Sequence, residues 1–329
     1  MVSRKFLFSL GWLVAIGLLL VLFYYTFSIS DLTDFLLLVK DAKPIWILAM
    51  AATELGTYAC TAGMYHVMLK GLGHQVPFRK LLPLSMEKLA VDQFIPTAGV
   101  GGSAIIVHGL KRVGATRQAA IGMVVIGLAA WYLAGDLAGI FGLWIVRESP
   151  LAFHGGLTVF GIYFAISLFI MYVTLHGVRT KAFAKIKRLL PGKALDTFFT
   201  EMSQTHDLGL VTRLGFSKVV FFQLGIILFD AGTLWFACLA LGTPIPFYFA
   251  LAGYALANMA ASISVLPGGI GAFEGGSVVI LSFLGMTPAT ALAATLLYRG
   301  LSVWLPMLPG AILARREIQH SYFKKSKSG

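Results

Sequence analysis

The sequence predicts an all-α polytopic membrane protein that forms a single integral membrane domain over residues 1–329. Its composition is 58% hydrophobic and 12% charged, whereas a soluble domain carries about 25% charged residues. The mean hydropathy of +0.83 agrees. Apolar runs long enough to cross a bilayer alternate with short basic segments, and proline and glycine break two of these runs. We therefore expect about six full transmembrane helices plus two re-entrant or broken helical hairpins, arranged as an inverted repeat.

The first half of the chain begins with Arg4 and Lys5 before an apolar run. This run is too long for a signal peptide and no small-residue cleavage site follows it. We expect, in order, a span over 6–27, an outer interfacial helix over 28–43, a span over 44–69, a broken segment over 81–110 and a span over 118–146. Residues 44–146 would form the first repeat.

The second half follows the same plan after an additional span. We expect a span over 154–176, a basic linker over 177–213, a span over 216–241, a broken segment over 247–285 and a last span over 288–313. Residues 216–313 would form the second repeat. The linker suits either an amphipathic helix on the inner leaflet or a solvated loop.

Charge sets the expected orientation. The net charge of +12 is concentrated in the segments between spans, and basic segments favour the cytoplasmic side. This rule places both termini and the linker in the cytoplasm. The first broken segment then enters and leaves from inside and the second from outside. Such opposed repeats are typical of alternating-access transporters.

The stretch 264–276 cannot be ordinary transmembrane helix. Pro267 removes a backbone donor, and Gly268, Gly269 and Gly271 oppose helix formation. Irregular backbone at membrane depth survives only where protein buries it or water reaches it. We interpret the stretch as the tip of a re-entrant hairpin or the break in a discontinuous helix. A plain extramembrane loop is the alternative.

A second copy of this element lies earlier in the chain. Pro96, Gly101, Gly102 and Ser103 form a similar proline–glycine break. Several landmarks recur 171 positions apart: Pro96 and Pro267, Leu110 and Leu281, Gly114 and Gly285, Thr116 and Thr287, and Ala120 and Ala291. The constant offset predicts an internal repeat.

Ionisable residues within apolar regions are candidates for function, because burying them is costly. The candidates are Glu54, Glu87, Lys88, Asp92, Asp136, Asp230, Glu274 and Arg299. Glu87 and Lys88 could instead lie near the interface. Asp136 and Asp230 could be hydrogen-bonded packing residues.

Glu274 and Arg299 form the sharper pair. Arg299 interrupts an apolar run and needs a partner, and Glu274 is the nearest acid in the sequence. One interpretation is a buried salt bridge. The other makes Arg299 a phosphate ligand, since its planar fork suits phosphate oxygens. Helices beginning near Ser103 and Gly275 would then direct their N-terminal amides at the same anion.

Enzyme and metal motifs are not evident. The sequence lacks a Walker loop, HExxH, GxSxG and Cys/His pairs at metal spacing. Cys60 and Cys238 lie in apolar spans and suit packing. We expect no cofactor and no metal. Nucleic acid is not an expected partner, because no soluble basic domain is present to hold it.

The motif Leu266–Glu274, followed by Leu296–Arg299 and Leu305-Pro306, resembles the flippase-like transmembrane domain of lysylphosphatidylglycerol synthases. The resemblance extends from about the first span to Arg315. It implies movement of lipid between leaflets. The catalytic half of those synthases is a separate soluble domain, so aminoacylation is not implied.

These observations predict a lipid flippase or transporter that moves an anionic phospholipid or lipid-linked headgroup across the inner membrane. The expected binding residues are Arg299, Glu274, Tyr298, Pro267, Gly268, Gly269, Gly271, Pro96, Gly101, Gly102 and Ser103. Further cavity or coupling charges would be Asp92, Lys88, Glu87, Glu54, Asp136 and Asp230. Two alternatives stay open. One is a non-transporting scaffold for a lipid-biosynthesis enzyme, and the other is a lipid transferase or phosphatase using Glu274 or Asp92.

Overall fold

A computed structural model describes Lys40, residues 42–94, Val107, and residues 109–176, 213–264 and 266–305. In these residues the protein is helical throughout. Its elements are α3 (Pro44–Gly71), α4 (Phe78–Phe94), α6 (Arg117–Val146), α7 (Pro150–His176), α10 (Arg213–Ala240), α11 (Phe247–Ile263), η1 (Pro267–Gly269), α12 (Ala272–Phe283), α13 (Pro288–Arg299) and η2 (Gly300–Trp304). The predicted span 6–27, the outer helix 28–43 up to Asp41, the first break and nearly all of the basic linker lie outside the described residues.

Four of the described helices are long and apolar enough to cross a membrane: Pro44–Gly71, Arg117–Val146, Phe153–Tyr172 and Gly215–Ala240. They match the predicted spans 44–69, 118–146, 154–176 and 216–241 closely. The polytopic all-helical class is therefore confirmed. The last predicted span is described only to Leu305, as α13 and η2.

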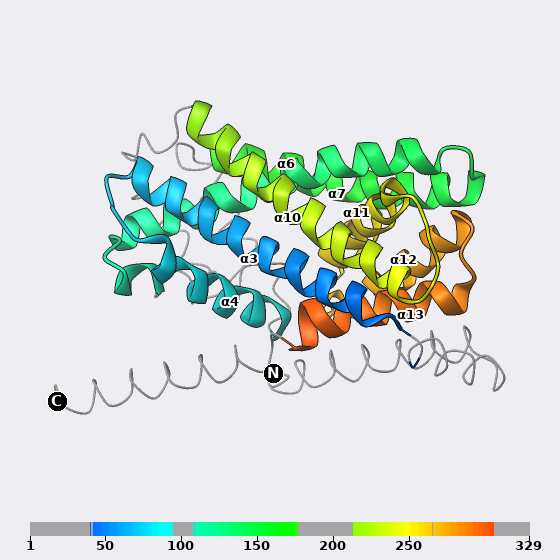
Figure 1. The fold of residues 1–329 in the computed structure, drawn as a ribbon. Helices are drawn as coiled ribbons and strands as arrows, with labels where there is room; N and C mark the ends of the chain where they lie inside the picture. The colour runs from blue at the N-terminus through cyan, green and yellow to red at the C-terminus, as the bar shows by residue number, and fades with distance from the viewer. Residues whose placement is uncertain are drawn as a thin grey trace, which may run out of the picture.

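The most extensive contact between described helices joins the antiparallel pair α3 and α10, which lie side by side (Figure 1). The start of α3 meets the end of α10, because Lys43 N–H donates to Ala240 O at 3.0 Å. Small residues allow the close approach: Gly56 of α3 lies against the ring of Phe229, where an added Cβ would come within 2.7 Å. Such small-residue contacts let membrane helices pack tightly.

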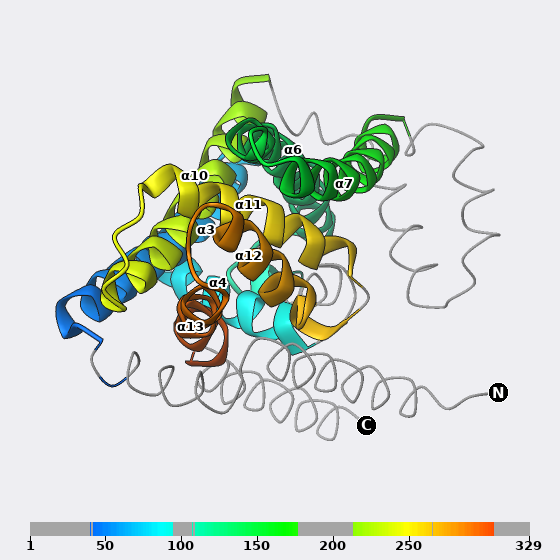
Figure 2. The ribbon, with the colours of Figure 1, turned by 90° about the vertical axis from the view of Figure 1, so that its right-hand side faces the viewer.

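Helices α4, α6, α11 and α13 pack against this pair, while Leu48 of α3 and Phe221 of α10 are exposed. Figure 2 shows α6 and α7 together on one side, and α13 on the opposite side of α12. Along the long axis of the molecule in Figure 1, α4 lies toward one end, and α11, α12 and α13 lie toward the other. The loops 71–77 and 111–116 lie at the α4 end, while the loops 147–149, 241–246 and 284–287 lie at the opposite end (Figure 1).

The turns at these opposite ends share their backbone geometry. Gly73, after α3, and Gly242, after α10, both have a positive φ, 78° and 74°. In each loop the next residue donates its amide to the carbonyl five positions back, at 2.9 and 3.0 Å. These two glycines are 169 positions apart.

The turns that follow the two broken segments also match. Gly114 and Gly285 have φ of 100° and 104°. Thr116 and Thr287 cap the next helices, each accepting the amide three residues on at 3.2 Å. The offset here is 171, so the second half carries two more residues between the two turns. Shared turns support the predicted repeat of 44–146 and 216–313, which stays a prediction.

Candidate functional site

The second broken segment is an interrupted helix. Helix α11 ends at Ile263, Ser264 is extended, and α12 begins at Ala272. Between them the backbone turns through Gly268, Gly269 and Gly271, with φ of 60°, 63° and 85°. Residues with a side chain rarely adopt these angles. The predicted break is thus present, and glycine is needed to form it.

The tip folds back onto α11. An added Cβ at Gly269 would lie 2.5 Å from Cβ and 3.0 Å from Cα of Ala261. In the same hairpin, a Cβ at Gly276 would lie 3.2 Å from Cα of Ala257. The two arms of the hairpin are therefore packed through glycine and alanine, with no room for larger side chains.

Arg299 holds this tip from the neighbouring helix α13. Its Nε donates to Glu274 Oε1 at 2.8 Å, and its Nη2 donates to the carbonyl of Gly268 at 2.7 Å. Both side chains are buried, with 5% and 1% exposed for Arg299 and Glu274. The guanidinium also lies over the ring of Phe273, 5.2 Å from its centroid. The predicted salt bridge is present, and it includes a backbone carbonyl that the sequence did not indicate.

Glu274, in the first turn of α12, also bonds the backbone of the tip. Its Oε2 accepts the amide of Gly271 at 2.7 Å, which places a carboxylate at the N-terminus of α12. An anion is favourable there. The helix begins at Ala272 rather than near Gly275, and Glu274 occupies the position expected for a lipid phosphate. We call Glu274, Arg299, Gly268 and Gly271 the tip clamp.

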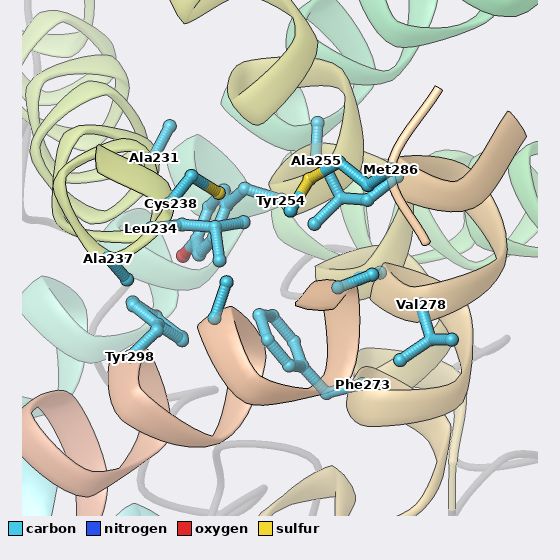
Figure 3. Packing of buried hydrophobic residues seen from close by; sticks show 14 of the residues in the cluster. Ala231, Leu234, Ala237, Cys238, Tyr254, Ala255, Phe273, Val278, Met286 and Tyr298 are labelled. Carbon is cyan, nitrogen blue, oxygen red and sulfur yellow. The ribbon is translucent and has the colours of Figure 1, made fainter. Parts of the chain in front are cut away.

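Three aromatic rings connect the tip clamp to α10 (Figure 3). Phe273 and Tyr298 stack with centroids 5.4 Å apart, and Tyr254 meets them edge-on at 5.9 and 6.0 Å. The hydroxyl of Tyr254 donates to Asp230 Oδ2 at 2.6 Å, and Thr57 donates to Asp230 Oδ1 at 2.8 Å. Asp230 is thereby tied to both α3 and α11. Among these, the sequence identified Asp230 and Tyr298 but not Thr57, Tyr254 or Phe273.

Glu54 lies on the same face of α3, one turn before Thr57. It is buried, 6% exposed, and its Oε2 makes no hydrogen bond. The hydroxyl of Tyr58, one turn further along α3, is likewise buried without a hydrogen-bond partner. Two of the predicted charges, Glu54 and Asp230, thus come together in the centre of the protein.

The other predicted charges lie in different surroundings. Asp136 on α6 accepts the hydroxyl of Ser167 on α7, as its packing alternative predicts. Glu87 pairs at 3.3 Å with Arg112, which is half exposed, and its interfacial alternative stays a prediction. Lys88 also has an interaction partner. The side chain of Asp92, and Pro96, Gly101, Gly102 and Ser103, lie outside the described residues.

The residues described by the structure contain no group of three or more His, Cys, Asp or Glu side chains that could hold a metal ion. Cys60 and Cys238 are both free. Cys238 belongs to the buried cluster around α10, α11 and α13, as predicted for a packing residue.

Comparison with known proteins agrees with this architecture. Residues 12–310 match a family model described as the lysylphosphatidylglycerol synthase TM region. The chain is also 22% identical, over 285 residues, to a UPF0104 membrane protein of Methanothermobacter thermautotrophicus. That similarity covers 81% of this chain and 83% of the archaeal protein.

Proposed function

Because this chain belongs to the family of the lysylphosphatidylglycerol synthase transmembrane region, a membrane family linked to lipid handling, we propose that it moves an anionic lipid headgroup between the leaflets of the cytoplasmic membrane. The observation that carries the proposal is the interrupted hairpin α11–η1–α12 with its buried tip clamp. Interrupted helices whose ends meet polar groups are the usual binding elements of secondary transporters.

Helix lengths support a hairpin that turns back inside the membrane. At 1.5 Å per residue, the 17 residues of α11 extend about 25 Å and the 12 residues of α12 about 18 Å. The hydrocarbon core is about 30 Å thick. Both arms begin or end near the 241–246 and 284–287 loops (Figure 1). We infer that the tip stops within the bilayer, where η1 packs against α4, which comes from the opposite end.

The distribution of basic residues supports the proposed orientation. The segments 70–80 and 111–117, which lie at the α4 end (Figure 1), include Lys70, Arg79, Lys80, Lys111, Arg112 and Arg117. Positive loops favour the cytoplasm, so we propose that this end is cytoplasmic and that the 147–149 and 241–246 loops are external. Both termini are proposed to be cytoplasmic as well.

The tip clamp suggests how a headgroup would bind. The Glu274 carboxylate is an anion that already accepts hydrogen bonds from Arg299 and from the amide of Gly271. A lipid phosphate carries the same kind of oxygens and would compete for both donors. In this proposal, Glu274 withdraws when a headgroup arrives, which loosens the tip and exposes the site to the other leaflet.

The test is lipid movement in proteoliposomes, using a fluorescent phosphatidylglycerol whose outer-leaflet signal is quenched chemically. We expect wild-type protein to accelerate its exchange. Arg299→Lys should fold but lose most of the activity, because lysine keeps the charge and loses the two-pronged fork. Arg147→Lys is the matched control, since Arg147 is exposed and pairs with Glu148 next to it in the chain.

Activity in Arg299→Lys equal to wild type would remove Arg299 from headgroup binding. A tip clamp that is purely structural would instead lower thermal stability and activity in parallel. Mass spectrometry of the lipid separates transport from catalysis, because a transferase or phosphatase changes the lipid. A scaffold would produce neither exchange nor a new lipid from purified protein.

A further inference from the structure

The antiparallel packing of α3 and α10 places two carboxyl groups, Glu54 and Asp230, in the centre of the protein; we call them the acid pair. They are 6% and 9% exposed. Asp230 accepts hydroxyl hydrogen bonds on both oxygens, from Thr57 and Tyr254. Two such donors stabilise an ionised carboxylate, so Asp230 can carry its charge in this position.

Glu54 has no comparable support. Its Oε2 is buried without a hydrogen-bond partner, and so is the hydroxyl of Tyr58 one turn further along α3. A buried ionised carboxylate without a partner costs several kcal/mol, more so beside a second negative charge. Glu54 must therefore hold a cation in this conformation.

A proton suits this site better than a metal ion. Oxygen-binding cations such as Ca²⁺ and Mg²⁺ take six or more ligands, but both oxygens of Asp230 already accept hydrogen bonds. The unpartnered oxygens here are Glu54 Oε2 and Tyr58 Oη. A proton needs only the first of these.

We propose that the acid pair binds one proton, taken up at Glu54 Oε2, and that this proton drives the movement of the hairpin. Uptake forms an O–H bond on Glu54 and removes one negative charge, and release returns the proton to water. The proposal rests on the proposed transport function and adds its energy source.

The connection to the hairpin runs through described contacts. Tyr254 belongs to α11 and binds Asp230, and its ring meets Phe273 and Tyr298. Phe273 lies under the guanidinium of Arg299 in the tip clamp. Protonation of Glu54 removes its repulsion of Asp230, and the bridge from Thr57 through Asp230 to Tyr254 is the contact by which this change reaches α11.

The titratable and charged groups that interact with the acid pair come from three helices. They are Tyr58 and Cys60 on α3, Tyr254 on α11, and Tyr298 on α13, with Arg299 acting on Tyr298. In the described part of the protein, none of these groups bonds Glu54 Oε2. Glu54 is therefore the group whose substitution should abolish proton binding.

The first measurement does not depend on transport. Infrared difference spectra of the purified protein between high and low pH should show the carbonyl stretch of a protonated carboxylic acid, and Glu54→Gln should lack it. Glutamine resembles the protonated side chain, so we expect this variant to fold. Asp136→Asn is the matched control, because Asp136 is equally buried at 6% and also has one unpartnered oxygen, Oδ1, but lies on α6, where it bonds Ser167 of α7. Any band from Asp136 should disappear in Asp136→Asn and stay in Glu54→Gln.

The second measurement applies a gradient of one pH unit across proteoliposomes. We expect it to speed lipid movement up to about tenfold in wild type and Asp136→Asn, and to have no effect on Glu54→Gln. A spectrum of Glu54→Gln that is unchanged from wild type, or lipid movement that follows a sodium gradient instead, would overturn the proposal. Wild-type transport that ignores the pH gradient would disprove the coupling and leave the proposed function standing. Absence of any wild-type transport would disprove the proposed function, and the infrared band alone would then decide whether the proton site exists.

Discussion

Substituting Gly269 by alanine tests whether the hairpin tip is built as closely against α11 as the structure shows. The position has φ of 63°, and its new Cβ would lie 2.5 Å from the Cβ of Ala261. A left-handed φ costs a residue with a side chain about 1–2 kcal/mol. Overpacking adds about 1–3 kcal/mol. We therefore expect Gly269→Ala to lower the free energy of unfolding by about 2–5 kcal/mol.

Two glycines of the same region provide matched controls. Gly285 has φ of 104° but nothing within 4 Å of its added Cβ, so Gly285→Ala should cost only the backbone strain, about 1–2 kcal/mol. Gly275 lies inside α12 at an ordinary φ with open space around it. Gly275→Ala should stabilise the protein by about 0.5–1 kcal/mol, because glycine weakens a helix relative to alanine.

The assay is unfolding of purified protein in mixed micelles, titrated with SDS and followed by tryptophan fluorescence. The order of stability should be Gly275→Ala, wild type, Gly285→Ala and then Gly269→Ala. If Gly269→Ala and Gly285→Ala lose the same free energy, the tip does not approach Ala261 closely. Lipid movement should fall in Gly269→Ala beyond its loss of folded protein, because a displaced tip moves the carbonyl of Gly268 away from Arg299.

Two further predictions concern the frame around the site. Thr116→Ala and Thr287→Ala should each destabilise by about 1 kcal/mol, because both threonines cap a helix in the same way; a loss in thermal-unfolding measurements for one but not the other would contradict the shared turn geometry. Thr53→Cys with Thr233→Cys, in a Cys60→Ala and Cys238→Ala background, should form a disulfide on mild oxidation, because the two hydroxyls are 2.8 Å apart. The control pair, Thr53→Cys with Leu228→Cys, should stay reduced on a gel, since Leu228 is half exposed on another face of α10. A disulfide in the control pair and none in the Thr53–Thr233 pair would disprove the antiparallel packing of α3 and α10.

Local sequence signals predicted the helices and the break well. Hydrophobic runs of about 20 residues defined α3, α6, α7 and α10 to within a few residues, because a membrane span requires that length. Proline and clustered glycines defined the interruption at 264–271, since those residues act on the backbone directly. The pairing of Glu274 with Arg299 followed from the cost of an isolated buried arginine.

Contacts between distant segments could not be predicted in this way. Thr57 and Tyr254 read as ordinary members of apolar helices, and only the packing of α3, α10 and α11 brings them to Asp230. The binding of Gly268 O by Arg299 depends on a carbonyl, which every residue carries and no sequence pattern marks. The same is true of the amide of Gly271, whose partner was expected to be an external phosphate.

The widened turn η2 gives the helix that carries Arg299 a particular mechanical property. Immediately after Arg299, the amide of Leu305 donates to the carbonyl of Gly300, five positions back, so this turn holds one more residue than an α-helical turn. Each residue of an α-helix advances about 100° around its axis. Passing the surplus residue to the preceding turn, which contains Arg299, would therefore rotate that turn by about the same angle while every amide kept a partner. We expect the guanidinium of Arg299 to be able to swing away from Glu274 by this slip, a screw motion that requires no unfolding of α13.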